Sequence, residues 1–269
     1  MAKLLVCPPD YYGIEYEINP WMRVSNAADL ERSSSQWHNL MQTLEKSGAE
    51  LEKMKPISGL PDLVFTANAG LTYDGKAVVS QFRQPERQRE EEYFERWFVE
   101  HGYSVVPLGV ESYFEGAGDL LGFGDIWFGG YRQRSDIAAY AALSKIYGKE
   151  ILPLELVNNK FYHLDTCFCP LSGGELLYYP EAFDSYAQET IDNFITDNRQ
   201  IVVPQFDAER FACNAVCIDR HVILPSGCHQ TMDLLKHYGY IPHPVELDEF
   251  IKSGGSAKCL TLALDQGSF

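Results

Sequence analysis

Side chains suited to catalysis occupy equivalent positions of a motif that recurs along the sequence. The motif starts at an aromatic residue in four copies and at a serine in the fifth, namely Phe65, Phe114, Tyr162, Phe211 and Ser256. One residue later the copies carry Thr66, Glu115, His163, Ala212 and Ala257, and three residues later Asn68, Ala117, Asp165, Asn214 and Cys259. Repetition alone would give similar residues in every copy. Their divergence into distinct chemical types predicts a functional site where the copies meet.

A thiol and an imidazole among these residues indicate nucleophilic catalysis. Cys259 would attack a substrate as the thiolate, and His163 would move protons. Cys259 follows two glycines and Lys258, and a tight backbone beside a cation is expected to lower a thiol pKa from its usual value of about 8.5. Most of the other cysteines lie in apolar runs, where a cysteine usually packs as a small buried hydrophobe.

The acidic residues point to a cationic substrate. Glu115 and Asp165 lie among apolar residues and glycines, where an unpaired buried carboxylate is costly. They must pair with an internal arginine or lysine, or face a pocket that receives a cation. A planar guanidinium fits two carboxylates opposite a thiol, because it offers paired N–H donors and an electrophilic carbon.

Two alternatives concern His163 and Asp165. On a strand both side chains would point to the same face, but His163 could also be a hydrogen-bonded core residue. The same strand would align them with Cys167 and Cys169 as metal ligands. The Cys-x-Cys spacing differs from that of structural zinc sites, and no second pair completes four ligands. Nucleotide-binding and serine-nucleophile motifs are absent from the sequence. We therefore expect neither a metal nor a cofactor.

The elements that must position these residues also repeat. The motif recurs about every 49 residues, and each copy is typical of a hairpin, a helix and a further strand. Hairpin turns are predicted at Asp74-Gly75 and Gly173-Gly174. Helical patterns cover residues 34–47, 85–101, 136–147 and 184–194, and strands follow from Tyr103, Glu150, Arg199 and Tyr240. The last copy ends after one strand, so we expect the N-terminal KLLVCPP to complete it and close a ring. Residues 1–269 are thus predicted to form one α/β domain.

Composition narrows the class of partner. The 269 residues are 45% hydrophobic and 22% charged, which is typical of a globular protein. A net charge of −16 argues against nucleic acid or an anionic membrane, since both require basic patches. The sequence holds seven cysteines and no apolar stretch near the length of a membrane span. The N-terminal apolar run is too short for a signal peptide. We expect a reduced, cytoplasmic protein with a small cationic substrate.

Three motifs carry a resemblance to a known group of enzymes. The segments FEGAGD from Phe114, YHLD from Tyr162 and GGSAKCLTL from Gly254 resemble the guanidine-modifying pentein superfamily. Its members include arginine deiminases, dimethylarginine dimethylaminohydrolases, amidinotransferases and arginine dihydrolases. The resemblance spans nearly the whole chain and implies a fivefold α/β propeller of strand–strand–helix–strand units.

The resemblance also implies roles for individual residues. Cys259 matches the nucleophile that forms a covalent thiouronium-type intermediate, and His163 the general acid and base. Glu115 and Asp165 match the carboxylates that grip the guanidinium. Arg87 and Arg134 match positions that bind the substrate carboxylate in the arginine-specific members. The alternative is that each is an ordinary surface charge.

Two asparagines favour one subfamily. Asn68 stands in F-T-A-N, where deiminases usually carry an aspartate, and Asn19 stands in INPWM from Ile18. This pair resembles the arginine dihydrolases, which convert arginine to ornithine, carbon dioxide and two ammonia without a cofactor. Either asparagine could instead form an Asx turn. Arginine deiminase and dimethylarginine dimethylaminohydrolase are the alternative activities, and a catalytically silent binding module is the alternative of another class. A homo-oligomer is also expected.

Overall fold

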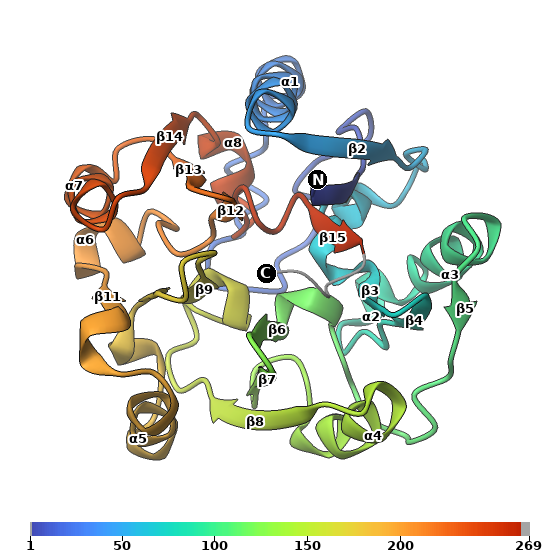
Figure 1. The fold of residues 1–269 in the computed structure, drawn as a ribbon. Helices are drawn as coiled ribbons and strands as arrows, with labels where there is room; N and C mark the ends of the chain where they lie inside the picture. Colours follow the sequence, from blue (N-terminus) through green and yellow to red (C-terminus); the bar gives the residue numbers. More distant parts are fainter. Residues whose placement is uncertain (1, 265–269) are drawn as a thin grey trace.

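The strands of the chain form five small sheets around a common centre (Figure 1). The computed structural model describes residues 2–264, and each sheet within that range has three strands. The first two strands of a sheet are antiparallel, and the third runs parallel to the second. A helix connects the second strand to the third. This is the unit that the recurring motif predicts.

The units follow one another along the chain. The first comprises β3 (Gly70–Tyr73), β4 (Lys76–Val79), α2 (Pro85–Gln88), α3 (Glu91–Glu100) and β5 (Ser104–Val105). The second comprises β6 (Leu120–Phe123), β7 (Ile126–Tyr131), α4 (Ile137–Tyr147) and β8 (Glu150–Glu155). The third comprises β9 (Phe168–Pro170), β10 (Leu176–Tyr178), α5 (Ser185–Phe194) and β11 (Gln200–Val202). The fourth comprises β12 (Val216–Ile218), β13 (His221–Pro225), α7 (His229–His237) and β14 (Ile241–Val245). The short helices α6 (Gln205–Ala208) and α8 (Asp248–Ile251) precede β12 and β15.

The fifth unit is assembled from both ends of the chain. It comprises β15 (Leu262–Leu264), β1 (Ala2–Val6), α1 (Leu30–Lys46) and β2 (Ala49–Lys53). Strand β15 pairs antiparallel with β1, with Leu262 opposite Leu5 and Leu264 opposite Lys3. The N-terminal strand therefore completes the last unit, as expected from its sequence.

The long helices lie outside the sheets, and the first strand of each unit lies nearest the centre (Figure 1). Helix α3 packs on the core through Phe94, Trp97 and Phe98, which are buried. The single helix expected over residues 85–101 is instead two helices, α2 and α3. The chain turns between them at residues 89–90, where Glu90 forms a buried ion pair with Arg87.

Neighbouring units are joined by aromatic side chains. Tyr73 of the first unit meets the ring of Trp127 of the second edge to face, with 5.2 Å between centroids. The hydroxyl of Tyr147 donates to the Leu71 carbonyl at 2.7 Å and accepts from the Val78 N–H at 3.1 Å. These contacts bury large rings and satisfy their polar atoms, so they fix the units relative to one another.

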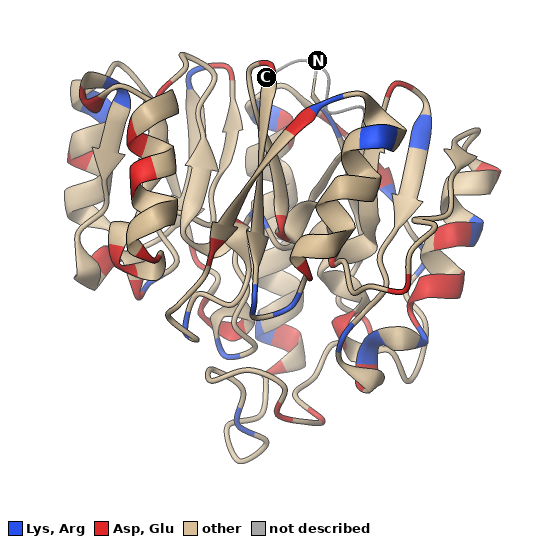
Figure 2. Cartoon of the chain, turned by 90° about the horizontal axis from the view of Figure 1, so that it is seen from below, with Lys and Arg blue, Asp and Glu red and all other residues tan. Residues whose placement is uncertain are grey.

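Charged side chains gather on the outer helices and the loops, with both signs interspersed (Figure 2). Within residues 2–264, no helix combines the length and the apolar character that crossing a membrane requires.

The cap of α5 provides a test of how an outer helix is held. Asp184 accepts a hydrogen bond from the Ala187 N–H at 2.8 Å. Replacing an N-cap aspartate by alanine usually costs about 1 kcal/mol. We expect Asp184→Ala to lower the free energy of unfolding in urea by that amount, whereas Glu189→Ala on the exposed face of α5 should leave it unchanged. Equal values for the two variants would contradict the capping role.

Candidate active site

The predicted site residues lie in tight turns that precede the innermost strands. Asn68 lies in the 3-10 helix η2 (Thr66–Ala69), and Glu115 immediately precedes η3 (Gly116–Gly118). His163 precedes η4 (Leu164–Thr166), which contains Asp165, and Cys259 lies in a turn before β15. All five side chains are buried, with at most 3% of their surface exposed. The turns place residues from four units in one region.

Glycine allows these turns to approach one another. Gly116 has φ +65°, and a Cβ there would lie 2.7 Å from the Gly70 carbonyl oxygen. A Cβ on Gly118 would lie 2.3 Å from the side-chain amide nitrogen of Asn68 and 3.5 Å from the ring of His163. Any larger residue would therefore push η3 away from its neighbours.

The expectation that His163 and Asp165 share the face of a strand is wrong. Both belong to the turn around η4, and β9 begins only at Phe168. The turn directs them to different partners: His163 contacts Glu115, and Asp165 contacts Cys259. The aligned strand of metal ligands is absent for the same reason. These residues lie close together because their turns are near the centre of the fold, not because side chains alternate along a strand.

The thiol of Cys259 lies beside a carboxylate and an amide. Its Sγ is 3.5 Å from Oδ2 and 3.7 Å from Oδ1 of Asp165. Asn214 donates from Nδ2 to the same sulfur at 3.1 Å. The Oδ1 of Asn214 accepts from the backbone N–H groups of Ser256 and Cys259 at 3.0 and 3.1 Å. Asn214, at the repeat position of Cys259, thus orients both the thiol and its turn.

Burial and the charge of Asp165 raise the pKa of Cys259 well above its usual range. The expectation that Lys258 and the tight backbone would lower this pKa is therefore wrong. The hydrogen bond from Asn214 lowers the pKa of the thiol, but burial and the carboxylate prevail. Burial raises the pKa of Asp165 to about 7, although the charge of Lys258 opposes this. The resting thiol is thus protonated, beside a carboxyl that titrates near neutrality.

His163 is held by a hydrogen bond with a carboxylate. Its Nε2 lies 2.7 Å from Oε2 of Glu115, and Nη1 of Arg134 lies 3.1 Å from the same oxygen. The other oxygen of Glu115 accepts from the Arg83 N–H at 3.2 Å. Burial opposes ionisation, but Arg134 and the hydrogen bond with His163 hold the pKa of Glu115 well below its usual value. Both oxygens of Glu115 thus have protein partners, which favours orientation of the imidazole over gripping of a guanidinium.

Arg87 and Arg134 are buried, each 3% exposed, so the alternative of surface charges is wrong. Arg87 binds Glu90 at 2.8 Å and donates to Oδ1 of Asn68 at 2.9 Å. Arg134 also donates to the Ile18 carbonyl at 2.9 Å. Each guanidinium has five N–H donors, so donors remain available on both arginines after these contacts.

The two asparagines have different local roles. Asn68 uses both ends of its amide, since Nδ2 donates to the Glu115 carbonyl at 3.1 Å while Oδ1 accepts from Arg87. Asn19 accepts from the N–H groups of Trp21 and Met22 at 2.9 and 3.2 Å. This is the Asx turn that the sequence left open for Asn19. Its Nδ2 donates to the Ser253 carbonyl at 2.9 Å.

A small cavity of about 10 Å³ lies between these groups. Its lining comprises Ile18, Asn19, Asp62, Phe65, Asn68, Arg87, Arg134, Tyr162, Ser253, Gly255 and Cys259. Five predicted site residues are among them, while Glu115, His163 and Asp165 lie outside this lining. A volume of this size holds about one water molecule, so a larger substrate requires the walls to move.

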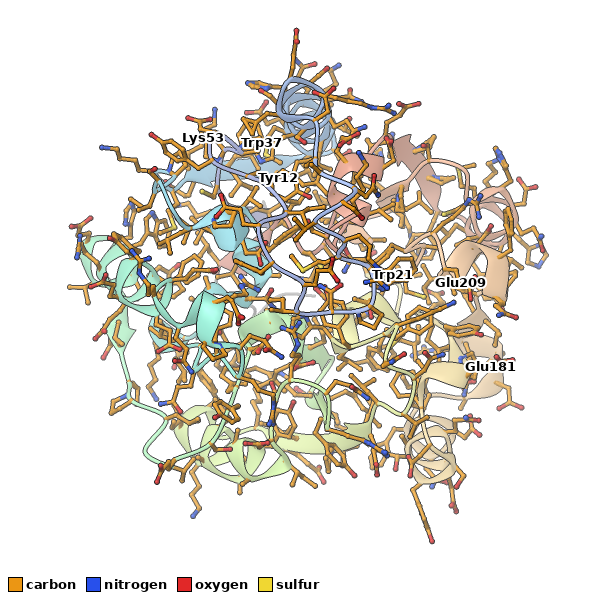
Figure 3. All side chains as sticks on the ribbon, turned by 180° about the vertical axis from the view of Figure 1, so that it is seen from behind. Tyr12, Trp21, Trp37, Lys53, Glu181 and Glu209 are labelled. Carbon is orange, nitrogen blue, oxygen red and sulfur yellow. The ribbon has the colours of Figure 1, made fainter. Side chains whose placement is uncertain are left out.

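An N-terminal segment covers the cavity. Figure 3 shows Tyr12 and Trp21 on this segment as it crosses that face of the molecule. Trp21 donates from its indole N–H to the Lys160 carbonyl at 2.8 Å, and its ring packs against Phe211. The hydroxyl of Tyr16 donates to Asp62 at 2.9 Å. Tyr12 anchors the segment in the core, where it is 2% exposed and its ring stacks on Phe250.

Sequence reasoning missed Asp62. This carboxylate is 3% exposed and lines the cavity. Its Oδ2 accepts from Tyr16, while Oδ1 has no hydrogen-bond partner among the described residues. Burial raises the pKa of Asp62, opposed by the charge of Arg87. A buried, unsatisfied acceptor at a cavity is suited to a cationic group of a ligand. Nothing in the segment PDLVF distinguishes it.

Asp119 was also missed, although it ends the FEGAGD motif. It accepts from the N–H and hydroxyl of Ser135 at 3.1 and 2.7 Å, and from the Leu164 N–H at 3.1 Å. The hydroxyl of Ser135 accepts from the Glu115 N–H at 2.9 Å. Asp119 therefore joins the two turns that carry Glu115 and His163.

The chain is similar to enzymes whose names refer to arginine or to dimethylarginine. Residues 15–265 match the family of eukaryotic N,N dimethylarginine dimethylhydrolases. The chain is 43% identical over 98% of its length to the bifunctional arginine dihydrolase/ornithine cyclodeaminase ArgZ of Synechocystis sp., and spans 38% of that protein. It is 39% identical to the N(G),N(G)-dimethylarginine dimethylaminohydrolase of Mycobacterium tuberculosis, covering 97% of this chain and 85% of that one. A variant of the N-terminal domain of ArgZ, covalently bound to a reaction intermediate, matches with a TM-score of 0.95 and 42% identity over 98% of both chains.

The contact between Asp165 and Cys259 gives a direct test of the thiol environment. The carboxylate raises the thiol pKa through its charge and its hydrogen bond. Asp165→Asn should therefore lower this pKa, and about one unit would give about tenfold more thiolate. We expect about tenfold faster alkylation of Cys259 by iodoacetamide near pH 8, measured by peptide mass spectrometry.

The six other cysteines are buried and serve as internal references, and Cys259→Ser identifies the labelled peptide. A folded Asp165→Asn variant that reacts no faster than the parent protein would overturn the assigned effect of the carboxylate.

Proposed function

The chain belongs to the N,N-dimethylarginine dimethylhydrolase family, and from this premise we propose that it is a cysteine-dependent arginine dihydrolase. The reaction converts arginine and two water molecules to ornithine, carbon dioxide and two ammonia. The family assignment confirms the resemblance to the guanidine-modifying penteins. We further propose that the five units form a fivefold pseudosymmetric propeller, folded as one domain over residues 1–269.

The observation that carries the proposal is one buried cavity with matching charges for each end of arginine. The thiol of Cys259 lines this cavity, and the carboxylate of Asp165, which lies outside the lining, is 3.5 Å from that sulfur. Asp62, Arg87 and Arg134 line the same cavity. We assign the guanidinium to Asp165, the α-carboxylate to the arginines and the α-ammonium to the free oxygen of Asp62. Each assignment joins opposite charges.

The chemistry uses the groups beside the thiol. A cationic guanidinium stabilises the thiolate form of Cys259, which attacks the guanidinium carbon. His163, oriented by Glu115, protonates the departing ammonia and then removes a proton from the attacking water. Water replaces the sulfur, leaving a ureido group. A second attack by the thiolate expels the second ammonia, and hydrolysis of the resulting thioester-like adduct releases a carbamate, which breaks down to ornithine and carbon dioxide.

The product ratio tests this proposal. Purified protein incubated with arginine should release two ammonia for each ornithine formed, measured by enzymatic ammonia assay and amino-acid analysis. Cys259→Ser should lose at least about a thousandfold in kcat/KM, because the hydroxyl is a far weaker nucleophile. One ammonia with citrulline would replace the dihydrolase assignment with a deiminase.

A second candidate is dimethylarginine hydrolysis, favoured by the family assignment and the mycobacterial relative. Incubation with N,N-dimethylarginine would then release dimethylamine and citrulline faster than arginine releases ammonia. Turnover of neither substrate, with Cys259 unreactive in folded protein, would favour a binding module and reject both activities.

Asn68 tests the control of the second hydrolysis. Its amide donates to the Glu115 carbonyl and accepts from Arg87. Asn68→Asp retains the oxygen that accepts from Arg87 but places a carboxylate against the Glu115 carbonyl. The added negative charge should strengthen binding of a guanidinium and weaken binding of the neutral ureido group. We expect ornithine to fall about tenfold relative to citrulline. Asn68→Ser, without a charge, is the matched control. Unchanged ornithine yield in Asn68→Asp would show that this residue does not govern the second step.

The remaining expectations stay proposals. All seven cysteines are free, which supports a reducing compartment such as the cytoplasm. The substrate is proposed to be a small cation, with neither nucleic acid nor a membrane as a partner. We also propose that the protein forms a homo-oligomer, which light scattering would detect as a mass above that of one chain.

A further inference from the structure

Opposite charges lie in the wall of the small cavity without pairing. Arg87 and Asp62 both line it, and each is 3% exposed. A buried guanidinium and a buried carboxylate in one cavity would be expected to pair with each other. Among residues 2–264, however, Oδ1 of Asp62 has no hydrogen-bond partner, and Oδ2 accepts from Tyr16. Another group must therefore hold the guanidinium of Arg87 in place.

That group is Glu90, which is fully buried and lies outside the cavity lining. Nε of Arg87 donates to Oε1 of Glu90 at 3.0 Å and lies 3.3 Å from Oε2. Nη2 of Arg87 donates to Oε2 at 2.8 Å. The carboxylate thus binds the Nε–Nη2 edge of the guanidinium through both oxygens, a bidentate contact that fixes the orientation of the plane.

The other donors of Arg87 are nearly all in use. Nη2 also donates to the backbone carbonyl of Asp62 at 3.2 Å, and Nη1 donates to Oδ1 of Asn68 at 2.9 Å. A guanidinium has five N–H groups, so these contacts leave one N–H on Nη1 for a ligand. The guanidinium lies against the backbone of Asp62, yet none of its hydrogen bonds within residues 2–264 reaches the carboxylate of that residue.

The pair also keeps both of its members charged in the interior. Burial raises the pKa of Glu90, and the charge of Arg87 is the strongest effect that opposes the rise. Burial opposes the charge of Arg87 in turn, but Glu90 is the strongest of the groups that together raise the pKa of Arg87 above its usual value. Arg87 is therefore a cation that does not need Asp62 as its counter-charge.

We propose that Glu90 is a positioning residue that holds Arg87 away from the carboxylate of Asp62, and so keeps an anion receptor and a cation receptor open in one cavity. The ligand class selected is an α-amino acid zwitterion. Its carboxylate meets the remaining Nη1 N–H of Arg87, and its ammonium meets Oδ1 of Asp62. This inference rests on the proposed function for the two ends of the ligand.

Removing the charge of Glu90 should close both receptors together. Glu90→Gln keeps the length of the side chain and one acceptor, but a neutral amide binds a guanidinium less strongly than a carboxylate does. Arg87 should then turn to Asp62. A crystal structure of the ligand-free variant should show the guanidinium within about 4 Å of Oδ1 of Asp62. An unmoved guanidinium, with that oxygen still unpartnered, would overturn the inference.

Ligand preference measures the same effect in solution. The compound 5-guanidinopentanoate retains the guanidinium, chain and carboxylate of arginine but lacks the α-ammonium. With Cys259→Ser to prevent turnover, calorimetry at about pH 8 should show tighter binding of arginine than of this analogue. Adding Glu90→Gln should lower that preference about tenfold, the effect of losing one charge-assisted contact. A general loosening of the fold would weaken both ligands alike, so an unchanged preference rejects the positioning role.

Two further variants identify the route of the effect. Glu92→Gln makes the same substitution at an exposed position of α3, and its preference should equal that of the parent protein. Asp62→Asn removes the cation receptor itself, so Glu90→Gln should lower the preference no further on that background. An equal fall on both backgrounds would show that Glu90 acts independently of Asp62 and would reject the inference. If Glu90→Gln does not fold, Glu90→Asp keeps the charge but withdraws it by one carbon. Its preference should fall by less, and a parental value would again reject the inference.

These measurements separate the inference from the proposed function, because neither binding nor the position of Arg87 requires hydrolysis. A shifted Arg87 and a lowered preference in Glu90→Gln, with no hydrolysis of arginine by the protein that retains Cys259, would reject only the proposed function. Hydrolysis of arginine, with Arg87 and the preference both parental in Glu90→Gln, would reject only the role of Glu90. The crystal structure decides that role even if neither ligand binds.

Discussion

Ionised groups buried at the centre of the ring need counter-charges, and this constraint shapes the rest of the structure. Glu115 binds His163 and Arg134, while Arg87 binds Glu90. Removing one partner from such a pair usually costs about 3–5 kcal/mol, because the other charge remains buried and unpaired. The turns, the glycines that let them approach and the break between α2 and α3 all serve to bring these partners together. The site is therefore a set of interdependent charges more than a collection of separate residues.

The same constraint separates two kinds of charge. The pairs around Glu115 and Arg87 are satisfied within the protein, and they hold other groups in place. Asp62 keeps an oxygen without a hydrogen bond, and Asp165 lies against a protonated thiol. These two carboxylates are the incompletely neutralised groups around Cys259. In the proposed function, the guanidinium supplies this counter-charge to Asp165, and the α-ammonium supplies it to Asp62.

The sequence predicted the architecture well, because the repeat carried two kinds of information. Its period gave the strand–strand–helix–strand unit and the pairing of the N-terminal strand with β15. Its columns placed Glu115, His163, Asp165, Asn68 and Cys259 in one region. What failed was local geometry: alternation along a strand cannot describe the 3-10 turn at His163. The expected thiol pKa was wrong as well, because burial of Cys259 and the charge of Asp165 arise from the tertiary structure and outweigh the neighbouring Lys258. Asp62 and Glu90 carried no signal, because their importance arises only from tertiary contacts with Tyr16 and Arg87.

The pairing of β15 with β1 has a consequence for how the protein is made. Cys259 stands three residues before β15, and that strand is held by a partner at the opposite end of the chain. During synthesis, β1 lacks its antiparallel partner β15 until more than two hundred further residues have been added, although β2 follows much sooner. The turn that carries Cys259 is therefore anchored by the contact that joins the two ends of the described chain. Before that contact forms, a growing chain already carries the histidine, the carboxylates and the arginines, but β15 and the turn before it still lack their partner strand.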